Sequence, residues 1–265
     1  MPEIVRICYE SWYKLNKTWE IIFLNGNNIN EFVDIQHILK ICRNKISVQA
    51  LSDIVRINLL NKYGGVWVDA TCYCNKPLDT WLEEVLFSGF FAFHRPGKDR
   101  MVSSWFLAAK PENYLVEVYC NHTNAFWLNN RSIRPIDSLT EKLIRKSRLG
   151  ILLFKKPYLW HSFFIVKILK QYHYYWFHYL FEKLYRTNKD FRNIWDQTPK
   201  IPADIPHGLL TYGLNRPISK KLKDEIDDNF APVYKLTWRL SYTPYIIDST
   251  YNYLYKTHIT RSKNY

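Results

Sequence analysis

Residues 52–71 read SDIVRINLLNKYGGVWVDAT, and this stretch decides the expected fold. Its first part has the spacing of apolar side chains that is typical of a helix, for which Ser47 fits the N-cap and Gly64 the natural stop. The two adjacent glycines permit a sharp turn into a short apolar strand over residues 66–69. A helix followed directly by an apolar strand indicates an α/β fold.

Three charged side chains of this stretch are candidate site residues. Asp53 and Arg56 are three residues apart, so on a helix they share one face about one turn apart. Asp69 ends the apolar strand, at the carboxyl edge where open α/β sheets bind ligands. The spacing therefore predicts an acid–base pair and a second carboxylate at one crevice. Taken alone, an Asp–Arg pair at this spacing is most often a surface ion pair, which is the alternative interpretation.

The rest of the first half alternates helix and strand signals. We expect helices over 2–15, 34–41, 79–86 and 111–127, and strands over 18–24, 90–93 and 104–108. This alternation favours a mixed or parallel α/β sheet. The second half differs, because residues 137–148 and 157–195 are expected to be helical and strand signals are rare before Val233. With no internal repeat and no Gly/Ser linker, we expect a single domain over 1–265, with an α/β part over 1–132 and a mostly helical part over 133–265.

The charge is concentrated in the second half. The 265 residues carry 37 basic and 24 acidic side chains, a formal net charge of +13. Residues 1–132 hold 14 basic and 13 acidic side chains, whereas residues 133–265 hold 23 and 11. Such an uneven excess indicates a polyanionic partner for the second half, namely nucleic acid, anionic lipid or a charged polysaccharide.

Composition excludes several classes of protein. An apolar content of 47% with 8 glycines and 12 prolines excludes disordered and collagen-like chains. The sequence contains no uninterrupted apolar run of about 18 residues and no signal-peptide pattern, so we expect a protein that stays in the cytosol. Five cysteines, an odd number, are expected to be reduced, with Cys72 and Cys74 as buried strand neighbours rather than zinc ligands.

The segment over residues 157–181 combines aromatic side chains with lysines. Two interpretations stay open. The segment suits a helix at a membrane interface, with Trp and Tyr at headgroup depth and Lys reaching anionic lipid. It equally suits a helical pair that packs over the active site and shapes the acceptor cleft.

The stretch 52–71 also resembles a known family. Its pattern S-D-x-x-R-x-x-L-L-x-x-Y-G-G-V-W-x-D-A-T is similar to that of the bacterial capsular polysaccharide synthesis proteins, relatives of the family-32 retaining glycosyltransferases. Three further segments resemble the same family: residues 2–12 its opening helix, 103–109 the strand after its metal motif, and 233–238 its K-L-T-W segment. The resemblance therefore spans residues 2–238.

The resemblance implies a GT-A-like α/β fold that binds a nucleotide-sugar. Residues 1–132 would form the donor-binding part, and residues 133–265 would face the acceptor and the membrane. Asp53, Arg56 and Asp69 would be the catalytic residues, with the first two hydrogen-bonded to the donor sugar. The wider donor site would comprise Asp53, Arg56, Tyr63, Gly64, Gly65, Trp67, Ser104, Lys235 and Trp238. From the residues alone, Trp67 and Ser104 are more simply interpreted as structural.

The family's metal motif is only partly present. Relatives carry D-x-D, whose carboxylates hold Mg²⁺ or Mn²⁺ against the donor diphosphate. Asp69 matches the first Asp, whereas Thr71 stands at the second. Tyr234 stands where relatives often have His, so His207 is the candidate third ligand, with a simple loop histidine as the alternative. With one carboxylate, we expect weak binding of Mn²⁺ or Mg²⁺ unless the donor is present.

These expectations describe a metal-dependent, hexosyltransferase-type glycosyltransferase of capsule or other surface polysaccharide synthesis, acting with retention. Its partners would be a nucleotide-sugar donor, a saccharide or lipid-linked saccharide acceptor, and the anionic inner face of the plasma membrane, where it would lie peripherally in the cytoplasm. We expect no nucleic-acid partner, since the sequence has no recognisable binding signature for one. Three alternatives stay open: a toxin-like transferase that glycosylates protein, a nucleic-acid-binding basic protein, and a noncatalytic relative.

Overall fold

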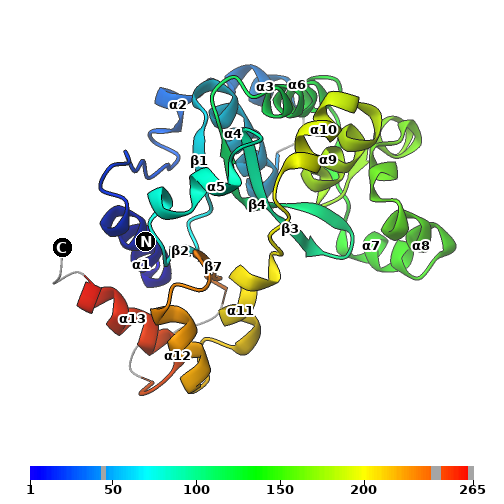
Figure 1. Ribbon diagram of the computed structural model, residues 1–265. Coiled ribbons are helices and arrows are strands. Elements are labelled where there is room, and N and C mark those ends of the chain that lie inside the picture. Colours follow the sequence, from blue (N-terminus) through cyan, green and yellow to red (C-terminus); the bar gives the residue numbers. More distant parts are fainter. Residues whose placement is uncertain (43–45, 240–245, 262–265) are drawn as a thin grey trace. The chain divides into compact units, whose positions relative to one another are not determined.

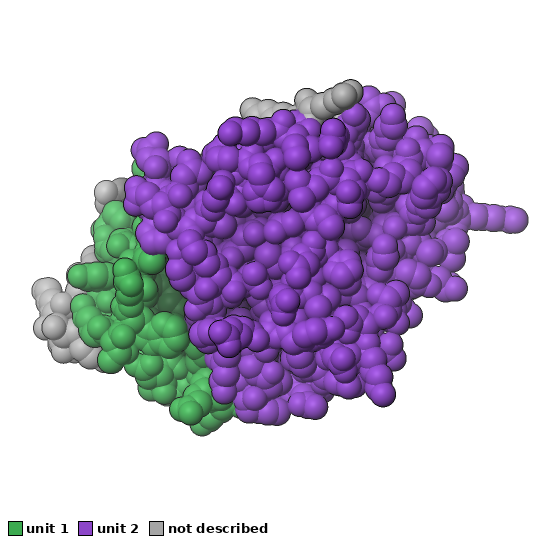
Figure 2. Space-filling model, turned by 90° about the horizontal axis from the view of Figure 1, so that it is seen from above, with its two compact units in different colours: residues 1–23, 68–85, 201–265 green, residues 24–67, 86–200 purple. Residues whose placement is uncertain are grey.

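A computed structural model describes residues 1–42, 46–239 and 246–261 (Figure 1). The chain divides into two compact units, each built from segments that are far apart in the sequence (Figure 2). Unit 1 comprises residues 1–23, 68–85 and 201–265, and unit 2 comprises residues 24–67 and 86–200. Each unit has a hydrophobic core of its own, so each is described by itself.

Unit 1 is mainly helical, with one two-stranded sheet. Its described elements are α1 (Glu3–Leu15), β2 (Cys72–Cys74), the 3₁₀ helix η1 (Leu78–Thr80), α5 (Leu82–Val85), α11 (Asp204–Tyr212), α12 (Lys220–Asp227), β7 (Val233–Lys235) and α13 (Thr250–Arg261).

The core of unit 1 forms between α1 and the β2–β7 sheet. The predicted opening helix is confirmed as α1, which buries Ile4, Val5, Cys8 and Trp12 at helical spacing. The indole of Trp12 donates a hydrogen bond of 2.8 Å to the Cys72 carbonyl oxygen on β2, which fixes the helix on the sheet.

Strands β2 and β7 pair antiparallel, with Cys72 opposite Lys235. Cys72 and Cys74 are both buried and unbridged, as the sequence predicted. This pairing brings together two segments that are more than a hundred and fifty residues apart, and it sets the position of Lys235 beside the segment that follows β1.

Unit 2 holds the larger sheet and most of the helices. Its described elements are α2 (Ile29–Phe32), α3 (Gln36–Ile41), α4 (Val48–Tyr63), β1 (Gly65–Val68), β3 (Phe90–Gly97), β4 (Arg100–Ala109), α6 (Tyr114–Leu128), β5 (Arg134–Pro135), α7 (Ser138–Arg145), α8 (Arg148–Lys155), the 3₁₀ helix η2 (Pro157–His161), the π-helix η3 (Phe164–Ile168), β6 (Gln171–Tyr172), α9 (Trp176–Thr187) and α10 (Lys189–Gln197).

The main sheet of unit 2 has the strand order β1-β4-β3. The strands predicted over 90–93 and 104–108 are confirmed, but β3 and β4 form an antiparallel hairpin with Gly97 opposite Arg100. The sequence left a mixed and a parallel sheet open, and this pair excludes an all-parallel sheet, because a short turn between two strands returns the chain antiparallel. Strands β5 and β6 pair in parallel over two residues. The fold is mixed α/β.

Helices α4, α6, α9 and α10 supply the rest of the core of unit 2, with α9 packed on β4 (Figure 1). Aromatic rings dominate this packing. Phe181 of α9 contacts Phe90 of β3 and Trp195 of α10, with ring centroids 6.3 and 5.0 Å apart. Offset and edge-on ring pairs of this kind stabilise a core beyond the area that they bury.

The aromatic segment over 157–181 is divided by the structure. Its second part is core, because α9 buries Trp176, Phe177 and Phe181. Its first part folds as η2 and the π-helix η3, and exposes Phe163 and Phe164 instead. The prediction that residues 157–195 are helical is confirmed for most of the segment, as the separate helices η2, η3, α9 and α10, with the short strand β6 between η3 and α9.

Two local predictions are wrong. Residues 18–24 form no strand. Thr18 and Trp19 instead donate hydrogen bonds of 2.5 and 2.7 Å to the Asp79 carboxylate. Asp79 consequently lies in η1 rather than capping a longer helix, and α5 begins only at Leu82. Among the described residues, no helix has the length and apolar character needed to span a bilayer.

Candidate active site

The structure confirms the predicted helix cap at Ser47, the helix end at Gly64 and the sharp turn into β1. Ser47 caps α4 by accepting a 3.2 Å hydrogen bond from the Ala50 amide. Gly64 ends the helix with φ of +69°, and Gly65 follows with φ of +84°. A Cβ atom on Gly64 would lie 2.7 Å from the Pro111 nitrogen, so this position needs glycine for both conformation and space.

Asp53 and Arg56 form a buried ion pair on α4. The Arg56 Nη1 atom lies 2.9 Å from Asp53 Oδ1, and the two side chains are only 5% and 8% exposed. Arg56 also donates hydrogen bonds to the Ser52 carbonyl and hydroxyl oxygens, at 3.2 and 2.8 Å. The interpretation as an exposed surface pair therefore does not hold, because a pair enclosed in this way is held by hydrogen bonds rather than screened by water.

The same guanidinium connects α4 to two strands. Its Nη1 atom donates 2.8 Å to the Ser104 carbonyl oxygen on β4. Its central carbon lies 5.3 Å from the ring centroid of Trp67 on β1 and 6.0 Å from that of Phe177 on α9. Arg56 therefore holds β1 in place beside β4. Of the predicted site residues, Trp67 contacts the guanidinium through its ring and Ser104 through its main-chain carbonyl oxygen.

Tyr63 lies at the carboxyl end of α4 and fixes the segment after α2. Its hydroxyl donates a 3.0 Å hydrogen bond to the Phe32 carbonyl oxygen, which also accepts 2.9 Å from Lys62. The Tyr63 ring is 50% exposed, and the Lys62 ammonium lies 4.7 Å from its centroid. An exposed ring of this kind can stack on a ligand, as the resemblance implies.

Asp69, Thr71 and Lys235 come together in unit 1. The Lys235 ammonium donates a 2.6 Å hydrogen bond to the Thr71 hydroxyl and lies 3.5 Å from Asp69 Oδ2. The cause is the β2–β7 pairing, which continues when the Leu236 amide donates 2.8 Å to the Thr71 carbonyl oxygen. The side chains of Asp69 and Lys235 are 30% and 17% exposed, so this polar cluster is reachable by solvent.

The residues of this cluster do not by themselves fit a divalent cation. A hard ion such as Mn²⁺ or Mg²⁺ takes several oxygen ligands. Asp69 and Thr71 offer one carboxylate and one hydroxyl, and an ammonium group already contacts both. Among the described residues, no group of three His, Cys, Asp or Glu side chains is placed to hold a metal. Dependence on Mn²⁺ or Mg²⁺ stays a prediction.

His207 and Trp238 are the remaining predicted site residues. His207 lies in α11 rather than in a loop, and its Nδ1 atom is 2.7 Å from the Ala203 carbonyl oxygen one turn earlier. Trp238 follows β7 and is 63% exposed. His207 therefore has a hydrogen-bond partner at the start of its own helix, and the indole of Trp238 is exposed to solvent.

Two groups beside the Asp53–Arg56 pair were not among the predicted site residues. The Ser52 hydroxyl is one, and its place in the S-D-x-x-R pattern was a usable signal. His178 is the other. Burial, together with the charges of Arg100, Arg56 and His173, lowers its pKa well below that of a free histidine, so the ring is neutral. Its position five residues after another histidine gave no signal, because its surroundings come from distant strands.

The α4–β1 segment lies within a part of the chain that matches a known protein family. A family model described as "Capsular polysaccharide synthesis protein" matches residues 1–147, which is more than half of the chain and includes the whole α4–β1 segment. Neither the curated proteins nor the solved structures contain a match.

Proposed function

Because the chain belongs to the capsular polysaccharide synthesis protein family, we propose that it is a glycosyltransferase that moves a sugar from a nucleotide-sugar to a saccharide acceptor. Membership in the family indicates a role in capsular polysaccharide synthesis. The observation that supports the finer proposal is the family match over residues 1–147, because it covers Asp53, Arg56 and Asp69, to which the resemblance assigns the donor site.

In this proposal the donor diphosphate lies at the Asp69–Thr71–Lys235 cluster. An ammonium group is a common partner for phosphate oxygens, and hydroxyl groups add hydrogen bonds. Asp69 holds the Lys235 side chain through its charge, at 3.5 Å. When the bond from the anomeric carbon to the diphosphate oxygen breaks, negative charge develops on the leaving group, and Lys235 offsets it.

That Asp53 and Arg56 orient the donor sugar is carried over from the resemblance to the family. Their enclosed geometry supports a positioning role, because Arg56 braces both β1 and β4. The acceptor hydroxyl then forms the new bond to the anomeric carbon, and its proton passes to the departing diphosphate oxygen. Retention of configuration follows from the resemblance to the family-32 transferases. A GT-A-like donor domain and a lipid-linked saccharide as acceptor complete the proposal.

The test uses the full chain and a panel of UDP- and GDP-sugars with Mn²⁺. We expect one donor to raise the melting temperature and to be hydrolysed slowly without acceptor. Lys235→Ala and Asp69→Ala are expected to abolish the stabilisation. Lys221→Ala is the matched control, because that side chain is 87% exposed and its ammonium lies 3.7 Å from Glu225 on the same helix, α12.

Two outcomes would overturn the proposal. One is the absence of binding and hydrolysis for every donor, which favours a noncatalytic relative. The other is full activity in Asp69→Ala, which removes Asp69 from the site. Salt-sensitive binding to random oligonucleotides without donor binding would favour a nucleic-acid-binding protein instead.

A further inference from the structure

Unit 2 carries an apolar and basic surface outside the candidate active site. It is formed by α8 and by the turn over residues 163–170, which contains η3. Both rest on one small hydrophobic cluster, in which Leu153 of α8 and Ile165 of η3 are buried with Trp160 and Tyr179. We call α8 and this turn the apolar-basic surface.

The turn 163–170 exposes large apolar side chains. Phe163, Ile168 and Phe164 are 73%, 58% and 56% exposed. Single exposed apolar residues are ordinary, but several on one turn mark an interaction surface. Lys167 and Lys170 are exposed on the same turn.

Helix α8 has the same character. Its only buried residues are Gly150 and Leu153, whereas its exposed apolar side chains are Leu149, Ile151, Leu152 and Phe154. A surface helix of a globular protein normally turns its apolar side chains to the core. Exposed basic side chains flank these, namely Arg148 and Lys155 at the two ends of α8 and Lys156 directly after it.

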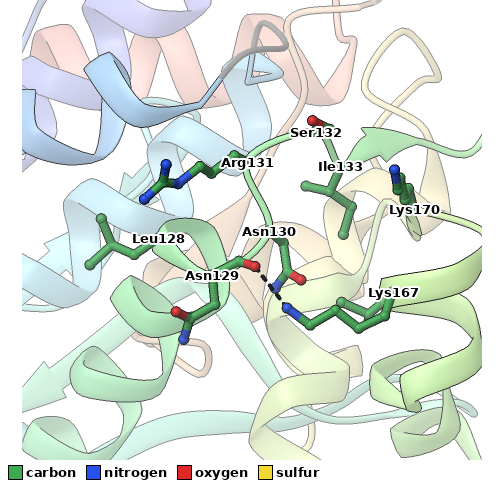
Figure 3. A pocket seen from close by; sticks show the side chains of 9 residues that line it. Leu128, Asn129, Asn130, Arg131, Ser132, Ile133, Lys167 and Lys170 are labelled. Carbon is green, nitrogen blue, oxygen red and sulfur yellow. Dashed lines mark hydrogen bonds between the residues drawn. The ribbon is translucent and has the colours of Figure 1, made fainter.

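A basic hollow adjoins the turn. It has a volume of about 470 Å³ and is lined by residues 128–133 at the end of α6, together with Val166, Lys167 and Lys170. Figure 3 shows Arg131 and Lys170 on opposite sides of it, and Lys167 donating 2.7 Å to the Asn129 carbonyl oxygen. Three of the residues that line the hollow are basic and none is acidic, so it suits an anion such as a phosphate group.

We propose that the apolar-basic surface docks the protein on an anionic lipid bilayer, with a lipid phosphate seated in the hollow between Arg131 and Lys170. The exposed Phe and Ile side chains enter the interface between headgroups and acyl chains, and the basic side chains meet the headgroups. Combined apolar and cationic contacts are the chemistry of peripheral membrane binding, since each term strengthens the other.

Other occupants fit this surface less well. A second copy of the chain in a symmetric contact would bring the same lysines and arginines opposite one another, and like charges repel. A nucleic acid matches the charge but offers aliphatic side chains such as Ile151 and Leu152 little to contact. A bilayer of anionic lipid satisfies both sets of side chains.

The experiment measures co-sedimentation of the full chain with vesicles of phosphatidylcholine, with and without phosphatidylglycerol. We expect binding to the anionic vesicles and weaker binding as salt rises. Each basic side chain near such a surface strengthens binding about fivefold, so Lys167→Gln/Lys170→Gln is expected to weaken it about 25-fold. Phe163→Ser/Phe164→Ser is expected to weaken it about tenfold or more.

Matched controls lie in unit 1. Phe230 is 62% exposed, and Lys220 and Lys221 are exposed on α12. Phe230→Ser and Lys220→Gln/Lys221→Gln should leave vesicle binding unchanged. All these substitutions are at exposed positions, and far-UV circular dichroism checks that the variants remain folded.

Four results would overturn the proposal: no binding to anionic vesicles, equal binding to vesicles of both compositions, equal loss in the controls, or a dimer that the Phe163→Ser/Phe164→Ser change dissociates. Release by inorganic phosphate at matched ionic strength would also overturn it, because a free anion would then be the ligand. The proposal rests on the proposed function in one respect only, namely that a lipid-linked acceptor would lie in the same membrane. Vesicle binding is measured without donor, so a chain that binds a nucleotide-sugar but no vesicles refutes the membrane surface alone.

Discussion

Replacing Arg56 by methionine tests whether the buried pair on α4 holds unit 2 together. The substitution keeps most of the side-chain volume but leaves the Asp53 carboxylate, 8% exposed, without its guanidinium. Breaking a buried pair by removing one partner costs about 3–5 kcal/mol, because a buried charge loses its compensation. We therefore expect Arg56→Met to lower the free energy of unfolding of unit 2 by this amount.

The second arm removes both charges. Asp53→Leu/Arg56→Met replaces the pair by apolar side chains, so no isolated carboxylate is left behind. The hydrogen bonds of Arg56 to Ser52 and to the Ser104 carbonyl are still lost, at about 1 kcal/mol each. We expect the double variant to be more stable than Arg56→Met by about 1–3 kcal/mol, because no buried carboxylate has lost its guanidinium in it.

Urea unfolding followed by far-UV circular dichroism measures these differences. The control is Arg95→Met, an exposed arginine of the same unit, which should change stability by less than about 0.5 kcal/mol. A cost below about 1 kcal/mol for Arg56→Met, or a double variant less stable than the single one, would refute the reasoning that burial makes this pair a structural brace.

The remaining predictions concern the backbone, the pH dependence of stability and metal binding. Gly64→Ala should destabilise the protein by about 2–4 kcal/mol, because it adds a clash with Pro111 to a strained φ. Gly65→Ala places its Cβ in open space and should cost about 1–2 kcal/mol, and thermal unfolding compares the two variants. Burial lowers the pKa of His161 from 6.5 to about 4, so the unfolded chain binds the proton first. The contribution of His161 to stability should therefore be complete above pH 6.5 and fall by about 3 kcal/mol as pH drops to about 4. Urea titrations at several pH values should show that His161→Gln removes this part of the dependence, while buried His178 still contributes in the same direction. Calorimetry with Mn²⁺ should show weak binding to the chain alone and tighter binding with UDP, because Asp69 is a single carboxylate; tight binding without UDP would contradict this.

The α4–β1 segment was predictable because its signals are local. A Ser47 cap, an apolar stripe and a Gly64 stop lie within one short stretch, and each acts through its own backbone. The burial of the Asp53–Arg56 pair was not predictable, since it depends on Trp67, Ser104 and Phe177, which the folded chain brings from three other elements.

Residues 18–24 show the opposite case. β-branched and aromatic side chains predicted a strand, but a strand needs a neighbour to take its hydrogen bonds. In this segment, Thr18 and Trp19 are bonded by their side chains to Asp79 instead. Local propensity therefore indicated that these residue types suit a strand, but it could not indicate whether a neighbouring strand would be there to pair with them.

The turn over residues 163–170 shows why the apolar pattern of the aromatic segment could not separate its buried residues from its exposed ones. In an α-helix, Leu169 would lie one turn below the buried Ile165, since residues four apart share a face, and the apolar pattern would be interpreted as a buried stripe. The π-helix η3 instead joins the Leu169 amide to the Phe164 carbonyl oxygen, at 3.0 Å and five residues apart. This wider turn places Leu169 below the exposed Phe164. Ile165 and Val166 are consequently buried, whereas the other apolar side chains of the turn are exposed beside Lys167 and Lys170. The membrane surface proposed for unit 2 therefore depends on one hydrogen-bond register that no apolar pattern specifies.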